Sequence, residues 1–495
     1  MSVTPLRNEI SPYNFLPFKF MRYPRQKTLV VNEAGEYLFL TSNEFNEFLN
    51  FTLPLNSSTY LDLKAKHFLY DSDKYLAPTI DLLATKYRTK KAFLRNFTTL
   101  HMVVTTLRCN HRCNYCHASS QDASSQKFDM SIKTARRVTE IIFETPSPII
   151  KIEFQGGESL LNFEAVREIV IYAEHLNKKK KKQMSFVLCT NLTLIDKKAL
   201  RFLKDYCVLI STSLDGPHDL HNANRIMRDG GDSYKTFIEN LELTRDVLGH
   251  EQVSALLTVT NGNLSMLRSV VDEYVRLGFD GIFLRSLNPY GYAKKESGRL
   301  LQYSVEGFVQ AYKETLKYII DLNLKGKLFS EYFANILLSR IMTPFPTGFM
   351  DLQSPAGAGI LGVIYNYNGD VYPTDEARML ANTGDTHFRL GNVHHNTYDE
   401  IFNNELLRKI TKNSCTETIP GCHSCAFQIY CGADPIRSYS QQNDKTYMGH
   451  IPSSEFCKKH KAIIAFLIDL IENNPDACDV FWTWITRRDL QAVRI

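Results

Sequence analysis

Strands and helices alternate through the middle of the chain, and this alternation limits the possible folds more than any other feature. Apolar runs typical of strands alternate with amphipathic stretches typical of helices between Thr98 and Ser286. The predicted strands are Leu100–Thr105, Ile149–Phe154, Phe186–Thr190, Val208–Ser213, Val253–Val259 and Gly281–Arg285. Because such crossovers share one hand, six repeats predict an α/β fold with a parallel sheet curved into a partial (β/α)6 barrel. Barrels of this kind carry their working residues at the C-terminal ends of the strands.

The regions on either side of this segment follow other patterns. Leu29–Val31 and Tyr37–Leu40 have the pattern of a hairpin, and helical patterns follow them. A chain of 495 residues is too long for one hydrophobic core. We therefore expect five units, which are a small α+β unit at 1–95, the barrel at 96–300, a helical connector at 301–345, a loop-rich region at 346–460 and a helical tail at 461–495.

The composition argues against several classes of protein. Apolar residues make up 44% and aromatic residues 12% of the chain, as in globular proteins with large cores. The net charge is +5. The chain has one dense basic run, Lys178 to Lys182, which is typical of a solvated helix end. We therefore expect no nucleic-acid partner. Neither a secretory signal nor a long apolar run is found, so we expect a cytoplasmic protein without a membrane partner. Eleven clustered cysteines in a reducing compartment indicate metal ligation rather than disulfides.

Three of these cysteines directly follow the first predicted strand of the barrel. Cys109, Cys113 and Cys116 lie within eight residues. Three thiolates at this spacing can hold three iron corners of a cubane cluster and leave the fourth iron without a protein ligand. A structural zinc site is the alternative, with His117 as the fourth ligand.

This cysteine motif resembles the signature of the radical S-adenosylmethionine (SAM) enzymes. The spacing C-x3-C-x2-C matches, and Tyr115 stands at the aromatic position before the last cysteine. In that family the open iron of a [4Fe–4S] cluster binds SAM, and an electron from the cluster releases a 5′-deoxyadenosyl radical. The resemblance implies that cluster and SAM as cofactors, with Cys109, Cys113 and Cys116 as the cluster ligands.

Further segments resemble the SAM-binding motifs of the same family, in the same order. Gly156-Gly157-Glu158 resembles a GGE motif whose glycines admit the methionine part of SAM and whose carboxylate accepts from its ammonium group. Asn191 stands where relatives carry T-N-G, but Leu192 replaces the glycine. The resemblance implies SAM contacts from Tyr115, Gly156, Gly157, Glu158, Asn191, Ser213, Asp215 and Arg225. Taken singly, each polar residue is explained equally well by the capping of a strand end.

A second group of cysteines lies near the C-terminus. Cys422, Cys425, Cys431 and Cys457 supply enough thiolates for one cluster or one zinc site, and the chemistry alone does not choose between them. The pattern resembles the C-terminal part of a SPASM domain, an extension that carries auxiliary clusters on radical SAM enzymes acting on peptides and proteins. The resemblance implies one auxiliary [4Fe–4S] cluster on these four cysteines.

A full SPASM domain binds two clusters, and this chain departs from that pattern. Where relatives carry the other cysteines, the chain has the segment from Ser354 to Ile360, then Thr374, and finally Pro435 after Cys431. The missing cysteines belong together to one cluster, so we infer that this cluster has been lost.

The remaining candidates carry weaker signals. Asp375 stands where one subgroup of SPASM enzymes keeps a catalytic aspartate, which implies that it takes a proton from a substrate radical. A carboxylate in a surface turn is the alternative. Cys415 has no assigned role, and Cys189, Cys207 and Cys478 lie among apolar neighbours, so we expect these three in the core.

A broader likeness extends over most of the chain. The segments YNFLPFKF, IFLRSLNPYGYA, GDVYPTDEARML and CGADP resemble the radical SAM maturases of His-Xaa-Ser systems. That likeness implies a peptide or small-protein substrate with His-Xaa-Ser repeats, a second radical SAM maturase as partner, and an electron donor such as a flavodoxin or ferredoxin. The alternatives are a radical SAM enzyme of the sulfatase-maturating type and a non-catalytic, metal-bound scaffold. Residues 1–95 resemble peptide-recognition domains that take a leader peptide as an added strand.

Overall fold

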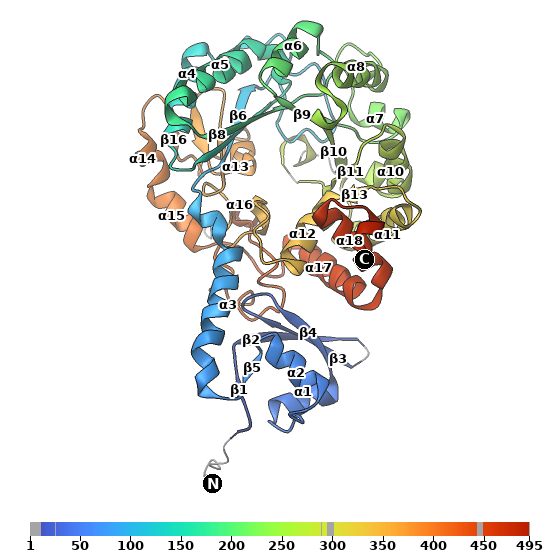
Figure 1. The fold of residues 1–495 in the computed structure, drawn as a ribbon. Coiled ribbons are helices and arrows are strands. Elements are labelled where there is room, and N and C mark those ends of the chain that lie inside the picture. The colour runs from blue at the N-terminus through green and yellow to red at the C-terminus, as the bar shows by residue number, and fades with distance from the viewer. Residues whose placement is uncertain (1–10, 25, 289, 295–300, 443–448, 495) are drawn as a thin grey trace.

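The computed structural model describes the chain except for residues 1–10, 25, 289, 295–300, 443–448 and 495. A curved sheet with helices around it forms the upper part of the molecule in Figure 1, and the N-terminal unit forms the lower part. Within the described residues, no helix combines the length and apolar character that a membrane crossing requires.

A nine-stranded sheet is the centre of the fold. Its order is β12-β10-β9-β8-β7-β6-β14-β15-β16, and every pair from β12 to β14 is parallel. The barrel strands are β6 (Leu100–Thr106), β7 (Ile149–Gly156), β8 (Gln183–Cys189), β9 (Leu209–Ser213), β10 (Val253–Val259) and β12 (Leu284–Ser286). This arrangement confirms the predicted α/β fold with a parallel sheet.

Helices follow the strands and lie around the outside of the curved sheet (Figure 1). They are α4 (Ile132–Glu144), α5 (Phe163–Lys180), α6 (Lys197–Asp205), α7 (His218–Asn224), α8 (Ser233–Leu248), α9 (Asn261–Leu264) and α10 (Leu267–Arg276). Ser131, Asp196 and Asp232 cap the starts of α4, α6 and α8 by accepting from backbone N–H groups. The largest hydrophobic core fills the space between the helices and the strands.

Two details of the sheet differ from the predicted strands. The last predicted strand divides, because Gly281–Ile282 (β11) leaves the sheet and pairs with β13 (Ser330–Glu331). Beyond β6, the sheet continues through β14 (Gly362–Tyr365), β15 (Asp370–Tyr372) and β16 (Gly391–Asn392). The C-terminal region therefore joins the barrel by backbone hydrogen bonds, which the sequence patterns did not indicate.

The N-terminal unit has its own sheet and its own core. An antiparallel sheet of β2 (Phe18–Tyr23), β3 (Lys27–Asn32) and β4 (Tyr37–Thr41) packs with α1 (Ser42–Leu49) and α2 (Ser58–Ala65). A short pair, β1 (Asn14–Phe15) and β5 (Leu69–Tyr70), closes the unit, and α3 (Leu76–Lys90) leads from it to the barrel (Figure 1).

Helices from late in the chain complete the structure. The long helices α11 (Val305–Leu324), α12 (Tyr332–Met342), α17 (Glu455–Asn473) and α18 (Pro475–Thr486) pack together beside the β12 edge of the sheet. The short helices are α13 (Asp375–Ala381), α14 (Tyr398–Phe402), α15 (Glu405–Lys412), α16 (Pro435–Ser440) and α19 (Leu490–Val493). Both sets matter for function because α13, α16 and α17 carry side chains toward the barrel interior.

Candidate active site

The three early cysteines lie in the long loop after β6, and Arg108 fixes this loop. Its Nε and Nη2 donate to the two oxygens of Asp129 at 2.7 and 2.6 Å. The same guanidinium donates to the carbonyl oxygens of Ala123 and Leu161. A bidentate arginine–carboxylate pair combines strength with a fixed orientation. The backbone beside Cys109 is therefore anchored on both sides of the loop.

These cysteines face a cavity of about 270 Å³ at the C-terminal ends of the barrel strands, which we call the cysteine cavity. The predicted site residues that line it are Cys109, Cys113, Tyr115, Cys116, Gly156, Gly157, Asn191, Ser213, Arg225 and Asp375. They come from the ends of four strands and from later segments. The structure thus brings together residues that are far apart in the sequence, while their individual contacts with SAM stay predictions.

The glycine pair at the end of β7 packs directly against the cysteine loop. A Cβ atom at Gly156 would lie 2.0 Å from the carbonyl oxygen of Thr106, and φ of Gly156 is +143°. At Gly157 a Cβ atom would lie 2.1 Å from the carbonyl oxygen of Arg108. Only glycine fits this close approach of two backbones.

Leu192, which stands where relatives carry a glycine, has a left-handed backbone conformation. Its φ is 64°, in the left-handed region that non-glycine residues rarely adopt, and its side chain is fully buried. The Thr190 hydroxyl supports the turn by accepting from the Leu192 N–H at 3.1 Å. The backbone path beside Asn191 is thus compatible with leucine.

Glu158 and Asp215 lie behind the cavity wall instead of on it. Glu158 is fully buried and accepts from the Thr190 hydroxyl at 2.7 Å and from the Asn191 N–H at 2.8 Å. Asp215 accepts from the Tyr115 hydroxyl at 2.6 Å and lies 3.4 Å from Arg225 Nε. These carboxylates position the residues that do line the cavity, and a direct contact of either with SAM stays a prediction.

Buried polar atoms without a hydrogen-bond partner line the cysteine cavity. They include His117 Nε2, Thr212 Oγ1 and Arg378 Nη1. Buried polar atoms in folded proteins are nearly always paired, so such a group indicates a polar ligand. SAM carries an ammonium, a carboxylate and ribose hydroxyls, and its chemistry fits this wall.

The cavity thiols need a nearby positive charge to ionise. Burial raises the pKa of Cys113 to about 12, although the Arg225 guanidinium opposes this effect. Burial and the neighbouring Cys113 thiol also raise the pKa of Cys109. Metal ions bind thiolates and favour deprotonation, so thiols with a raised pKa, such as those of Cys109 and Cys113, fit the iron of a cluster.

The four C-terminal cysteines also lie together. Burial, together with the neighbouring thiols of Cys425 and Cys457, raises the pKa of Cys431 to about 12 and that of Cys422 to about 11. Cys415 lies apart, with its Sγ 3.4 Å from the Thr411 carbonyl oxygen. In the described part of the chain, no three His, Cys, Asp or Glu side chains are grouped so as to hold a single metal ion.

The positions of the missing cysteines have structural roles. Thr374 caps α13 by accepting from the Ala377 N–H at 3.2 Å. The Ser354 hydroxyl accepts from the Thr416 N–H at 2.8 Å and donates to Glu417. Pro435 is the first residue of α16. The loss of one auxiliary cluster stays a prediction.

None of the three expected core cysteines is among the buried core residues of the described structure. Cys189 is the last residue of β8, lines the cysteine cavity, and lies 3.7 Å from Glu153 Oε1. Cys207 follows α6 in a left-handed conformation and is exposed. The prediction was wrong for both because each stands at the end of an element, where apolar sequence neighbours do not enclose a side chain. Cys478 is partly buried in α18.

Asp375 lies on the cavity wall and not in a surface turn. Its Oδ1 accepts from Arg378 Nε at 3.0 Å and from Nη2 at 2.8 Å. The sequence analysis missed Arg378 and Arg285, which also line the cavity. Arg285 could have been found, because it ends the sixth predicted strand, where barrels place their working residues. Arg378 had no comparable signal.

The sequence matches two protein-domain families, and the first of them includes much of the wall of the cysteine cavity. Residues 103–274 match the radical SAM superfamily. The chain carries a radical SAM domain. Residues 362–426 match the SPASM iron–sulfur cluster-binding domain. The chain is therefore a radical SAM enzyme, with SAM and a [4Fe–4S] cluster as cofactors of the first domain and auxiliary iron–sulfur chemistry in the second.

Individual proteins with similar sequence or fold extend this result. The cysteine-type anaerobic sulfatase-maturating enzyme of Clostridium perfringens (strain 13 / Type A) is 23% identical over 74% of this chain and 95% of its own length. The solved structure "Native anSMEcpe with bound AdoMet" has a TM-score of 0.63 at 19% identity, covering 76% of this chain and 99% of that one. Streptococcus suis SuiB bound to precursor peptide SuiA has a TM-score of 0.51 at 15% identity, covering 89% and 98%. At these identities the solved structures establish a shared fold.

Proposed function

We propose that this radical SAM enzyme modifies a peptide or small protein after translation. The observation that carries the proposal is the placement of the early cysteines, the glycine pair and Asp375 around one cavity. When bound there, the cluster and SAM supply a 5′-deoxyadenosyl radical. A matching enzyme that matures sulfatases and a solved relative with a bound precursor peptide support a polypeptide substrate.

The chain's own residues have separate tasks in this proposal. Cys109, Cys113 and Cys116 hold the cluster, and Gly156 and Gly157 leave room for the methionine part of SAM. Arg225 lies 5.5 Å over the Tyr115 ring and carries the positive charge for the SAM carboxylate.

Asp375 is the proposed proton acceptor. Its Oδ1 accepts from the Arg378 guanidinium, which orients the carboxylate, while the side chain still lines the cysteine cavity. A carboxylate in this position can take a proton from a substrate radical. Cys422, Cys425, Cys431 and Cys457 hold one auxiliary cluster.

The proposed substrate is a small protein with His-Xaa-Ser repeats. The proposal follows from the resemblance to the HxsB maturases, and it includes a second radical SAM maturase and an electron donor such as a flavodoxin or ferredoxin as partners. The N-terminal unit is the proposed binding site for the peptide. Its outer strand β2 pairs with β3 on one side only among the described strands, so the other edge can take an added strand.

A sulfatase-maturating activity is the second candidate. It is favoured by the match to the sulfatase-maturating enzyme over 95% of that protein's length. Both activities share the radical chemistry and differ in the polypeptide that is modified, so substrate choice separates them.

The test is anaerobic incubation of the reconstituted enzyme with SAM, a strong reductant and one polypeptide at a time. A His-Xaa-Ser repeat protein and a cysteine-type sulfatase peptide are compared by mass spectrometry. A mass change on the repeat protein alone, absent with Cys116→Ala, is the expected result. A change on the sulfatase peptide alone would select the second candidate, and SAM binding without 5′-deoxyadenosine release would identify a non-catalytic scaffold.

A further inference from the structure

A second cavity adjoins the cysteine cavity. Its volume is about 340 Å³, and it lies between the ends of the barrel strands and the segments that carry α13, α16 and α17. The two cavities share Gln155, Leu256, Arg285 and Asp375 in their walls. A group bound in the second cavity therefore lies next to the site proposed for SAM.

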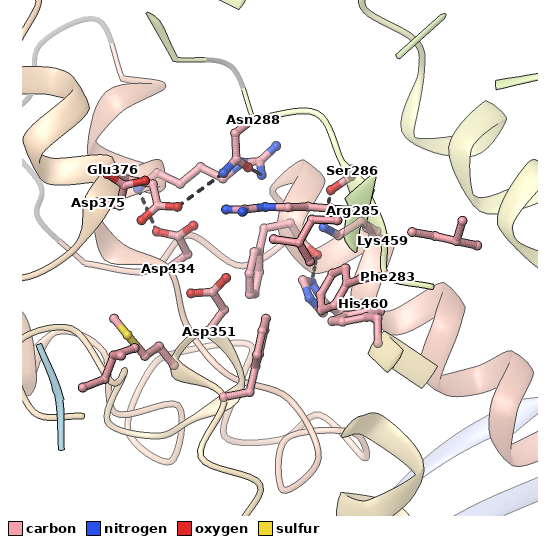
Figure 2. A pocket seen from close by; sticks show the side chains of 18 of the residues that line it. Phe283, Arg285, Ser286, Asn288, Asp351, Asp375, Glu376, Asp434, Lys459 and His460 are labelled. Carbon is pink, nitrogen blue, oxygen red and sulfur yellow. Dashed lines mark hydrogen bonds between the residues drawn. The ribbon is translucent and has the colours of Figure 1, made fainter. Parts of the chain in front are cut away.

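One side of this cavity is acidic, and we call it the acidic cavity. Figure 2 shows the carboxylates of Asp351, Asp375, Glu376 and Asp434 gathered on one side, with Lys459 and His460 on the other. The apolar part of the wall consists of Phe283, Phe308, Phe333, Phe349 and Phe456. These side chains come from seven segments of the sequence, so the fold and not one local motif assembles the group.

The acidic side chains are only partly paired within the protein. Glu376 accepts from Asn288 Nδ2 at 3.3 Å, and Asp434 accepts from the backbone N–H of Arg437 at 2.9 Å. In the described structure, Asp351 forms no hydrogen bond or ion pair, although its carboxylate lines the cavity. An enclosed carboxylate without a partner is costly unless a ligand supplies one.

The cations of the same cavity have other partners. Lys459 donates to Ser286 Oγ at 2.8 Å, and Arg437 lies 3.8 Å from Glu455. Across the described residues, no ion pair within 4.0 Å joins Arg285, Arg437 or Lys459 to the Asp351, Glu376 or Asp434 carboxylates. The basic and the acidic side chains thus line the same cavity without pairing with one another.

The carboxylates repel one another in this arrangement. Burial, together with the charges of Asp351 and Asp434, raises the pKa of Glu376 to about 8, and Arg285 opposes this effect only in part. Burial and Asp351 raise the pKa of Asp434 to about 6. An entering positive charge would relieve this repulsion.

We propose that the acidic cavity is a subsite for a positively charged side chain of the peptide substrate, held by the carboxylates of Asp351, Glu376 and Asp434. This inference rests on the proposed function and adds the chemical class of the residue that is bound. The phenylalanine wall suits the apolar stem of a long basic side chain and the cation itself.

A peptide fits this cavity better than a metal ion does. Among the described residues, no three His, Cys, Asp or Glu side chains are grouped so as to hold a metal ion, and Arg285 and Lys459 add hydrogen-bond donors to the same space. Their N–H groups can instead donate to the backbone carbonyl oxygens of a peptide whose basic side chain lies among the acids. The combination of donors and carboxylates therefore favours a basic peptide segment.

The test uses the reconstituted holoenzyme and the peptides Ac-Gly-Gly-X-Gly-Gly-NH2, in which X is Lys, Arg, Met or Glu. Affinity is measured by anaerobic calorimetry with SAM present. We expect the Lys and Arg peptides to bind at least tenfold more tightly than the Met peptide and the Glu peptide to bind most weakly. Equal affinity for the Lys and Met peptides, or a preference for Glu, would overturn the proposal.

Variants locate this preference in the cavity. Asp351→Asn and Asp434→Asn keep the shape of the side chains and should each reduce the preference for Lys over Met to threefold or less, with iron content as the check on folding. Asp62→Asn, in exposed α2, is the matched control and should leave the preference unchanged. A preference that survives both cavity variants contradicts the proposal, and so does displacement of the Lys peptide by Ca²⁺ or Mn²⁺.

Failure of this inference is distinguishable from failure of the proposed function. Formation of 5′-deoxyadenosine is measured with the same enzyme preparations before any peptide is added. If 5′-deoxyadenosine forms and no charge preference is found, only the subsite is rejected. If none forms, the radical chemistry itself is rejected.

Discussion

At the scale of single residues, backbone conformation at Gly156, Gly157 and Leu192 shapes the turns beside the cysteine cavity. The two glycines could be recognised from the sequence, because a G-G-E triplet after a strand predicts a close approach. The direction of the Glu158 side chain could not, because it depends on Thr190 and Asn191 from the next strand. Hydrogen-bond partners more than thirty residues further along the chain leave no pattern in the local sequence around Glu158.

Substitution of Gly156 should disturb the cysteine loop. In Gly156→Ala the new Cβ would lie 2.0 Å from the Thr106 carbonyl oxygen, so the loop that carries Cys109 must move. We expect a loss of about 3 kcal/mol or more in stability and incomplete incorporation of iron. Gly230→Ala is the control, since Gly230 also has a positive φ, at +80°, but no atom within 4 Å of an added Cβ. Full iron content in Gly156→Ala, measured by chemical iron assay, would contradict this account.

Glu376 should make the stability of the protein dependent on pH. Burial raises its folded-state pKa to about 8, above its ordinary value of 4.5, so the folded state binds more protons between these pH values. The contribution of Glu376 to stability is therefore fully present below pH 4.5 and is lost as the pH rises through 8.

The neutral variant Glu376→Gln should not lose stability through this group as the pH rises. Its advantage over the wild type should grow by an amount on the order of 1–3 kcal/mol between pH 5.5 and pH 8.5. Anaerobic thermal melts at several pH values measure it as a growing difference in Tm. Parallel Tm curves for the two proteins would show that the carboxyl group is not perturbed in this way.

At the scale of elements, the barrel could be predicted from the sequence and its extension could not. Each barrel strand is a local apolar run before a helix, so periodicity was sufficient to find it. In contrast, β14 has four residues, and it joins the sheet by pairing with β6, far earlier in the chain. Partners of short strands are set by tertiary packing, which the sequence pattern does not contain.

The helix α12 should control the auxiliary cluster through Arg340. This buried side chain donates to the carbonyl oxygens of Tyr430 at 2.9 Å and Ile429 at 3.0 Å, beside Cys431. In Arg340→Leu these carbonyls lose their partners, at a cost of about 2–3 kcal/mol. We expect iron to fall from about eight to about four per chain, with the early cluster kept.

The matched control for this experiment is Arg276→Gln on α10, where the arginine is largely exposed and pairs with Glu273. It should retain the iron content of the wild type. Iron near eight per chain in Arg340→Leu would mean that this segment keeps its shape without the arginine.

At the scale of the whole molecule, the N-terminal unit is docked on the C-terminal region. The Tyr430 hydroxyl donates to the Gly35 carbonyl oxygen at 2.7 Å, and Lys19 Nζ donates to Gln428 Oε1 at 2.7 Å. The sequence indicated an α+β unit but not this docking, because the contacts join residues about four hundred positions apart. Removal of the whole unit would therefore also disturb the auxiliary region, and point substitutions test peptide binding better.

Peptide recognition by the N-terminal unit is tested on the outer strand β2. Phe20 lies on this strand and is 48% exposed. If the peptide adds to that edge, Phe20→Lys should weaken binding of a His-Xaa-Ser repeat protein about tenfold and leave formation of 5′-deoxyadenosine unchanged. Leu61→Lys, at a comparably exposed leucine of α2, serves as control. Unchanged affinity in Phe20→Lys would reject this binding site.

In the proposed mechanism, three thiols in the loop after β6 hold a cluster that splits SAM. The most direct measurement is the yield of 5′-deoxyadenosine from the anaerobically reconstituted protein with SAM and dithionite, compared with Cys116→Ala. We expect steady formation by the wild type and a loss of at least a hundredfold in the variant, while the iron of the auxiliary site stays bound. A wild-type protein with about eight irons per chain that releases no 5′-deoxyadenosine would contradict the account.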